Sequence, residues 1–206
     1  MQKRIYLLIA VLGLTLPKVK AQTVAYTKLS DKYLFKVNTV KATTRDNADK
    51  ISKLVLSISD QNNKLLQQIT VTPEYLYSTT FKSGDQSRSY ITGKNVKAEH
   101  MDNDFGDLII ADLNFDGKED IALKYDSGGN GGPLYNFYVW QPSGLFVKDN
   151  FLADNMQFFP ADINSKDKTL TITVHASAFD NNKTTFKYNT QTKHWAIIKS
   201  TLIKNK

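Results

Sequence analysis

The sequence predicts an all-β fold, an antiparallel sandwich or barrel-like single domain with one inserted Asp-rich loop, and three observations support this class. Apolar and polar residues alternate with a period of two along many short segments, which is typical of half-buried strands. Clusters rich in Asn and Asp separate these segments and favour tight turns. The chain has 17 Asp but only three Glu, and Asp is a poor helix former. A propeller-like arrangement of the sheets is the alternative.

The N-terminus has the pattern of an export signal. Lys3 and Arg4 precede an apolar stretch over residues 5–16, which is shorter than the roughly 20 apolar residues that span a bilayer. This pattern predicts a secretory signal peptide cleaved after Ala21, with an uncleaved membrane anchor as the alternative. The mature domain, residues 22–206, is then expected in the periplasm or outside the cell, with no stable membrane insertion.

The charge of the chain gives little support to nucleic-acid binding. The sequence carries 27 Lys and Arg against 20 Asp and Glu, a formal net charge of +7. The first 21 residues hold four of the positive charges and no acid, which leaves +3 on the remaining 185 residues. No basic run occurs in that part, so nucleic acid is not an expected partner. The absence of cysteine excludes disulfides and thiolate metal sites.

The strands are expected where the alternation is clearest, at residues 33–37, 53–58, 65–71 and 168–175. Residues 136–141 are bulky at every position, which predicts a central strand covered on both faces. Polar clusters at residues 60–63, 164–167, 180–182 and 189–192 are expected to be the connections between strands. Residues 45–53 and 152–158 are the places where a helical turn or two is expected.

The segment 112–120 has the spacing of a calcium loop. Its positions 1, 3, 5, 7 and 9 are Asp112, Asn114, Asp116, Lys118 and Asp120. A hard cation such as Ca²⁺ takes six to eight oxygen ligands, and Gly117 permits the sharp turn between them. Lys118 would offer its backbone carbonyl, and no Glu follows at position 12 as an EF-hand requires. Calcium is the expected cofactor, in a structural role, and a hairpin turn that binds no metal is the alternative.

The same loop resembles those of FG-GAP-type repeats, in which a strand enters D-x-[DN]-x-D-G-x-x-D and another strand leaves. Phe105-Gly106 lies upstream of it. Such propellers repeat the loop in each blade, whereas this chain has it once. Residues 162–166 offer the first two ligands but place Lys166 where the third is needed. A repeat propeller is therefore disfavoured.

A second motif follows in residues 126–133, where four of the ten glycines fall within five positions. No Lys-Ser or Lys-Thr follows, so a phosphate-binding loop is not expected. The segment is either a flexible connection or a projecting loop that enters the cleft of a partner. The candidate partner-binding residues are Ser127, Gly128, Gly129, Asn130 and Tyr135.

Residues 105–140 as a whole resemble a family of exported bacterial immunity proteins associated with type IV secretion killing systems. Their shared order is strand, single calcium loop, strand, glycine-rich loop and aromatic strand. The resemblance implies an all-β calcium-binding protein that inhibits a peptidoglycan hydrolase, a lysozyme-like effector. Periplasmic lysozyme inhibitors more widely carry S-G-x-x-Y. Here Ser127-Gly128 is present, the fifth position is Gly131, and the nearest tyrosine in sequence is Tyr135.

No catalytic residue is expected. The three histidines lack metal-site spacing, and no G-x-S-x-G elbow occurs. Two alternatives to an inhibitor remain. One is an extracytoplasmic glycan- or protein-binding module, for which four aromatic residues could form a sugar-stacking surface: Trp140, Trp195, Tyr135 and Tyr138. The other is a secreted hydrolase of unknown specificity.

Overall fold

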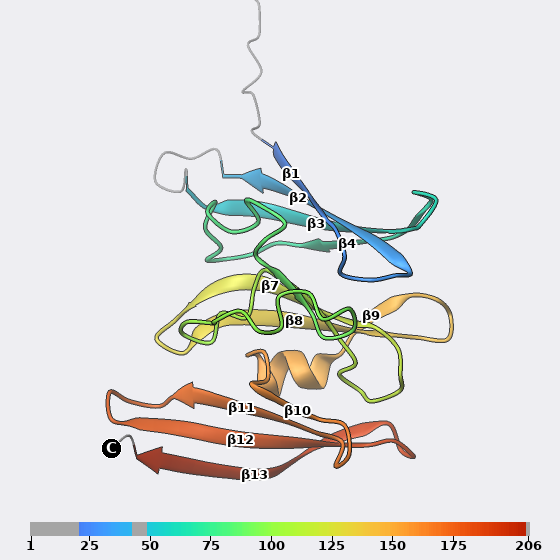
Figure 1. The fold of residues 1–206 in the computed structure, drawn as a ribbon. Coiled ribbons are helices and arrows are strands. Elements are labelled where there is room, and N and C mark those ends of the chain that lie inside the picture. Colours follow the sequence, from blue (N-terminus) through green and yellow to red (C-terminus); the bar gives the residue numbers. More distant parts are fainter. Residues whose placement is uncertain (1–20, 43–48, 205–206) are drawn as a thin grey trace, which may run out of the picture.

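The fold consists of three β-sheets stacked on one another, as a computed structural model shows for residues 21–42 and 49–204 (Figure 1). The sheets follow the order of the chain, so the N-terminal sheet and the C-terminal sheet form the two outer layers. Each layer is built from neighbouring strands in sequence, which keeps the connections short. The predicted all-β single domain is confirmed, and no sheet of the described residues closes into a barrel.

The first sheet is antiparallel with the order β1-β2-β3-β4. Its strands are β1 (Ala21–Tyr26), β2 (Tyr33–Lys41), β3 (Ile51–Asp60) and β4 (Leu65–Val71). The period-two pattern is confirmed in β3, where Leu54, Leu56 and Ile58 are fully buried. Leu65 is half exposed because β4 begins there, beside a register irregularity.

The middle sheet has the order β5-β6-β7-β8-β9 and is antiparallel except for the pair β5 and β6. Its strands are β5 (Ser87–Ser89), β6 (Leu108–Ala111), β7 (Asp120–Gly129), β8 (Gly132–Trp140) and β9 (Phe146–Lys148). The loop 112–119 joins β6 to β7 at one end. The β7–β8 hairpin closes the other end, about 30 Å away at the usual rise of a strand.

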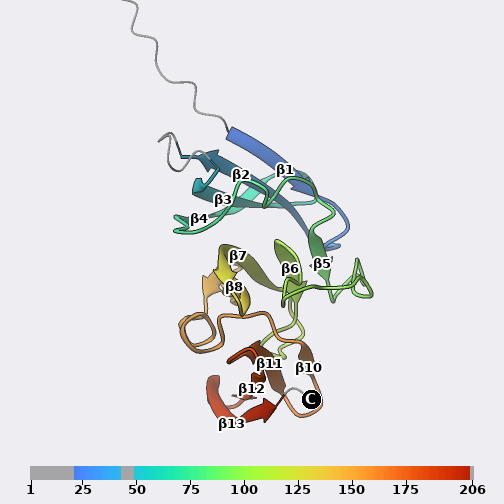
Figure 2. The same ribbon diagram turned by 90° about the vertical axis from the view of Figure 1, so that its left-hand side faces the viewer.

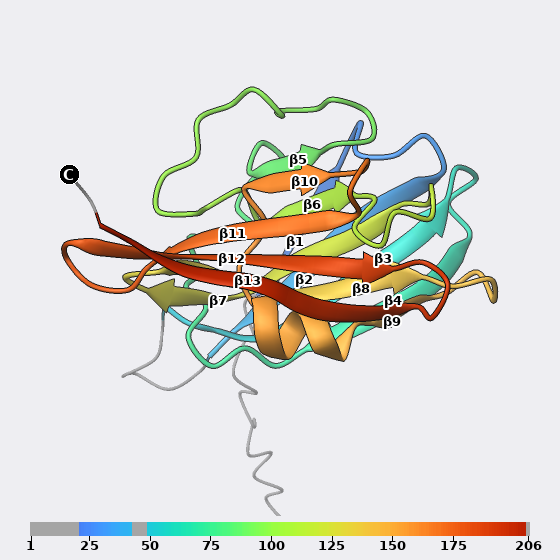
Figure 3. The same ribbon diagram turned by 90° about the horizontal axis from the view of Figure 1, so that it is seen from below.

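The third sheet is antiparallel with the order β10-β11-β12-β13, and Figure 3 shows it from its outer side. Its strands are β10 (Asp162–Asn164), β11 (Thr169–His175), β12 (Asp180–Asn189) and β13 (His194–Lys204). A short π-helix, η2 (Leu152–Met156), lies between this sheet and the middle one. It confirms the helical turn expected near residues 152–158.

Two hydrophobic cores lie on opposite faces of the middle sheet. Figure 2 shows the three sheets as separate layers. Along β7, Ile121 and Leu123 belong to the core shared with the first sheet, while Ala122 belongs to the core shared with the third. In β8, Phe137 and Tyr138 divide in the same way. The prediction of a central strand at residues 136–141 is therefore confirmed, because a middle layer buries both of its faces.

Two predicted elements differ from the structure. Residues 180–182 were expected to be a connection but form the start of β12, because the turn is made by the preceding residues 176–179. In the predicted helical segment 45–53, residues 51–53 belong to β3, and residues 43–48 lie outside the described residues. The predicted signal peptide also lies outside them, except that Ala21 begins β1. No helix of the described segments is long and apolar enough to cross a membrane.

Candidate functional site

The loop 112–120 curls around the side chain of Asp112. Its carboxylate accepts hydrogen bonds from the backbone N–H groups of Asp116 and Gly117, both at 3.0 Å. Gly117 has a φ of +77°, a conformation that other L-residues rarely adopt. Burial raises the pKa of Asp112, and these two hydrogen bonds oppose the rise. The loop is thus wound around its first acidic residue.

The last acidic residue of the loop, Asp120, is fully buried at the start of β7. One carboxylate oxygen accepts the N–H groups of Leu113 and Asn114, at 2.9 and 3.2 Å, and the other accepts the N–H of Trp140 at 2.9 Å. Burial raises the pKa of Asp120 from its ordinary 3.8 to about 7. A cation beside this carboxylate would favour its ionised form and lower the pKa again.

The carboxylate, amide and carbonyl oxygens of this loop are the ligand types that calcium prefers. In the structure the carboxylates accept hydrogen bonds from backbone N–H groups of the loop. Asn114 donates to Asp116 at 3.2 Å, and Lys118 directs its ammonium toward the Trp140 ring, 5.4 Å from the centroid. In residues 21–42 and 49–204, no three His, Cys, Asp or Glu side chains gather where they would hold a metal ion. Glu119 is buried, and its Oε2 has no hydrogen-bond partner. Calcium would therefore require these loop oxygens to draw closer together and to bind it through lone pairs that the amides leave free.

The glycine-rich segment is the end of the β7–β8 hairpin, with a two-residue turn at Asn130 and Gly131. Gly132 has a φ of +98°, and a Cβ there would lie 2.0 Å from the carbonyl oxygen of Asp102. Gly128, with a φ of +65°, faces Gly132 so closely that a Cβ would lie 1.8 Å from its oxygen. These glycines fix a narrow hairpin, and the exposed tip is Gly128–Asn130.

Tyr135 does not belong to this tip. It is fully buried in the core between the middle and third sheets, and its hydroxyl donates to the carbonyl of Gly106 at 2.9 Å. The prediction that Tyr135 contacts a partner is therefore corrected, because it points into the second core.

A buried ion pair lies close to Tyr135. Lys124 places its ammonium 2.9 Å from Asp107 and 2.7 Å from Asp104, and the side chains of Lys124 and Asp107 are both buried. Burial raises the pKa of Asp107, and Lys124 opposes this rise. The single ammonium offsets part of the negative charge that the two acids would otherwise leave beneath the hairpin.

Two tyrosines that the sequence analysis missed lie beside Ser127. The N–H of Ser127 donates to the carbonyl of Tyr75 at 2.8 Å, and the N–H of Tyr77 approaches the Ser127 hydroxyl at 3.4 Å. The side chains of Tyr75 and Tyr77 are about half exposed, at 50% and 48%. They stand some 50 residues away in sequence, so only the approach of the 73–77 segment to β7 in the fold reveals them.

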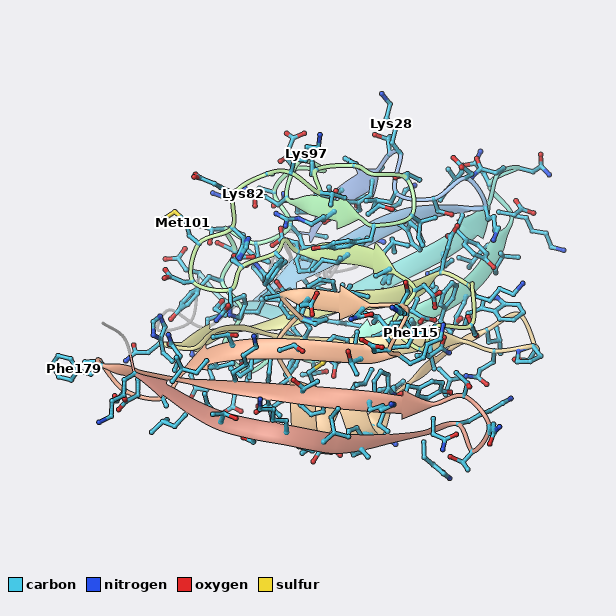
Figure 4. All side chains as sticks on the ribbon, turned by 60° about the horizontal axis from the view of Figure 1, so that its bottom comes forward. Lys28, Lys82, Lys97, Met101, Phe115 and Phe179 are labelled. Atoms are coloured by element: carbon cyan, nitrogen blue, oxygen red, sulfur yellow. The ribbon has the colours of Figure 1, made fainter. Side chains whose placement is uncertain are left out.

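The other side of the tip faces the β11–β12 connection. Asn130 and residues 175–178 line a shallow hollow, and Asn103 donates to the carbonyl of Gly131 at 2.9 Å. Next to them project the two most exposed large apolar side chains of the described residues, Phe179 at 77% and Met101 at 76% (Figure 4). One end of the molecule therefore combines a narrow hairpin tip with exposed aromatic and apolar groups.

Comparison with known proteins adds one likeness in fold. A solved structure described as a Xanthomonas type IV secretion system related protein matches with a TM-score of 0.55, covering 90% of this chain and 88% of that chain. The two chains share this fold. Their sequences are 17% identical. No protein-family model matches the chain, and no curated protein matches it.

Proposed function

We propose that this protein is an exported, calcium-binding protein without catalytic activity that binds and inhibits a peptidoglycan hydrolase of the lysozyme type. The β7–β8 hairpin tip would enter the cleft of the enzyme. The shared fold with a protein related to a type IV secretion system supports a role beside such a system. The resemblance of residues 105–140 to immunity proteins of these systems supports the choice of partner.

The observation that carries the proposal is the exposed tip at Gly128–Asn130 with two tyrosines beside it. A narrow, pre-organised hairpin loses little conformational entropy when it enters a cleft. Tyrosine combines a large apolar ring with a hydroxyl and is enriched at the centres of interfaces. Tyr75 and Tyr77 would supply, from another part of the chain, the aromatic contact that Tyr135 cannot make.

Calcium would act at the far end of the middle sheet, in a structural role. The ion would be held by Asp112, Asn114, Asp116, the carbonyl of Lys118, and Asp120. Bound there, it would offset the repulsion among three carboxylates and fix the loop between β6 and β7. Because Asp120 also binds the N–H of Trp140, the ion would steady the end of β8 as well.

We place the protein in the periplasm or outside the cell. The support is the predicted signal peptide at residues 1–21, together with the shared fold with the secretion-related protein. Mass spectrometry of exported material is expected to find Gln22 as the first residue, and an intact Met1 would contradict the cleavage.

The test is an assay of peptidoglycan lysis by a lysozyme-type hydrolase, taken from a neighbouring gene where one is encoded there. The purified protein is expected to slow lysis. With Gly129→Arg or Tyr77→Ala, the concentration of inhibitor needed for half-maximal inhibition is expected to rise at least tenfold, since one anchoring contact is worth about 1.4 kcal/mol or more. Gly129 has no atom within 4 Å of a new Cβ, so the larger side chain should not disturb the fold. Leu145→Ala, beyond the opposite end of β8, is the matched control and should inhibit normally. Equal inhibition by all four proteins would contradict the hairpin mechanism.

A further inference from the structure

The last strand, β13, forms one edge of the third sheet (Figure 3). It has 11 residues, contains no proline and pairs with β12 alone among the described strands. A long edge strand presents a row of unpaired N–H and C=O groups, which proteins usually shield with charges, proline or bulges. The central part of β13 has one lysine, Lys199, and one bulge, where Ile198 stands opposite no residue of β12. From Lys199 to Lys204 the edge is regular and open to another strand.

The second hydrophobic core ends at β12 and leaves apolar side chains of β13 uncovered. Phe186 and Thr184 of β12 are buried, whereas their partners on β13, Ile197 and Ser200, are exposed. Four large apolar side chains within seven consecutive residues of β13 are between 41% and 59% exposed: Ile197, Ile198, Leu202 and Ile203. A cluster of exposed apolar groups at an open edge is typical of an interaction surface.

The sequence of this run is nearly the same in both directions about Ser200. Residues 197–203 read Ile-Ile-Lys-Ser-Thr-Leu-Ile. If two such strands pair antiparallel about a two-fold axis at Ser200, Ile198 of one copy faces Leu202 of the other, and Lys199 faces Thr201. Each of these contacts occurs twice, and no lysine directly faces a lysine. The edge is therefore complementary to itself.

We propose that β13 pairs in this way with β13 of a second copy of this chain. The two third sheets would join into one continuous sheet of eight strands. The register places Leu202 in line with Asn182 and Val174, on the face that carries the second core. The two Ile198–Leu202 pairs would therefore continue that core across the seam.

The pairing leaves both hairpin tips free. Each tip lies beside residues 175–178, near the end of β13 where Lys204 pairs with Asp180. Because the two β13 strands run antiparallel, the tips would lie toward opposite ends of the joined sheet. The dimer does not depend on the proposed inhibition, but it would allow two hydrolase molecules to be bound at once.

A cysteine at Ser200 tests the position of the axis, since the chain has no cysteine of its own. Directly opposite residues of an antiparallel pair have Cβ atoms about 4.5 to 5.5 Å apart, close to the distance that a disulfide spans. Under mild oxidation the mature Ser200→Cys protein is expected to run as a linked dimer on a non-reducing gel. Ser143→Cys, in an exposed turn, is the matched control and should remain a monomer. Equal linkage in both variants, or none in Ser200→Cys, would overturn the proposal.

An exchange of charges tests the register. The unmutated protein is expected to dimerise in sedimentation velocity with a dissociation constant of about 10 to 100 µM, because the seam is short. Ile198→Lys or Leu202→Glu should each weaken the dimer at least tenfold, since each change disrupts both apolar pairs. The double variant should recover the dimer, because each lysine then faces a glutamate of the other copy. Both side chains are more than half exposed, so the fold should tolerate these changes.

Four results would overturn the proposal. The unmutated protein could remain a monomer at ten times the expected dissociation constant, or form a dimer that Ile198→Lys leaves unchanged. The double variant could fail to dimerise. Finally, β13 could be protected from hydrogen exchange only when a hydrolase is added, which would assign this edge to the enzyme. Ile198→Lys should still inhibit lysis, so loss of the dimer is distinguishable from loss of the proposed function.

Discussion

The carboxylate of Asp120 accepts a hydrogen bond from the backbone N–H of Trp140 at 2.9 Å, which joins the end of the Asp-rich loop to the end of β8. Asp120 is the ninth position of the proposed calcium loop, and Trp140 is the last residue of β8. A change in the charge or position of Asp120 therefore acts on the hydrogen bond that holds the end of β8. The loop and the end of β8 form one structural unit, distant from the hairpin tip.

Calcium is expected to stabilise the protein through this unit. At a concentration 100 times the dissociation constant, binding adds about 2.7 kcal/mol and should raise the thermal midpoint by about 5 to 10 °C. The double variant Asp112→Ala, Asp116→Ala should lose this shift in differential scanning calorimetry. Asp162→Ala, in the incomplete loop 162–166, is the control and should keep it. Absence of any shift in the unmutated protein would rule out the metal.

The glycines of the hairpin differ in what they tolerate. Gly132→Ala should destabilise the protein by about 1 to 3 kcal/mol, because its φ is positive and its Cβ would meet the carbonyl of Asp102. Gly129→Ala should change stability by less than about 0.5 kcal/mol, because nothing lies near its Cβ. Urea unfolding of the two variants makes the comparison. Similar losses in both would show that the hairpin is not packed as described.

The buried ion pair beneath the hairpin should be costly to break. Lys124→Met removes the charge that lies 2.9 Å from Asp107, and leaving a buried carboxylate unpaired costs about 3 to 5 kcal/mol. Lys148→Met, at an exposed position in β9, should cost little. Chemical denaturation of both variants at neutral pH measures the difference, and a loss under about 1 kcal/mol for Lys124→Met would contradict the structural role.

Asp107 should also make stability depend on pH. Burial raises its pKa in the folded protein above the ordinary 3.8, so the folded state retains this proton at pH values where the unfolded chain has lost it. The free energy of unfolding should therefore fall as pH rises from about 4 toward the raised pKa. Asp107→Asn should reduce this slope in urea titrations between pH 4 and 7, and Asp31→Asn, on an exposed turn, should not. An unchanged slope in Asp107→Asn would contradict the assignment.

The sequence was sufficient to predict several of the longer strands, since period-two alternation is a local pattern. The alternation in β3 and the spacing of Asp112, Asn114 and Asp116 are visible without a fold. The three-layer stack was not predicted, although the bulky residues of β8 indicated a strand buried on both faces. Period-two patterns show which face of a strand is apolar and not which sheet covers it.

The candidate site depended more on tertiary contacts. Tyr135 is near Ser127 in sequence, but it faces the core because the register of β8 directs it there. Tyr75 and Tyr77 carried no local signal, and only their contacts with Ser127 bring them to the tip. The approach of the β12–β13 hairpin to the Asp-rich loop is likewise a property of the stacked sheets.

The most direct measurement of the proposed inhibition is amide hydrogen exchange on the protein alone and in complex with the cognate hydrolase. We predict protection in the complex at Gly128–Asn130 and at Tyr75 and Tyr77, with little change at residues 140–142. Protection confined to other surfaces, with the hairpin tip exchanging as in the free protein, would contradict the account.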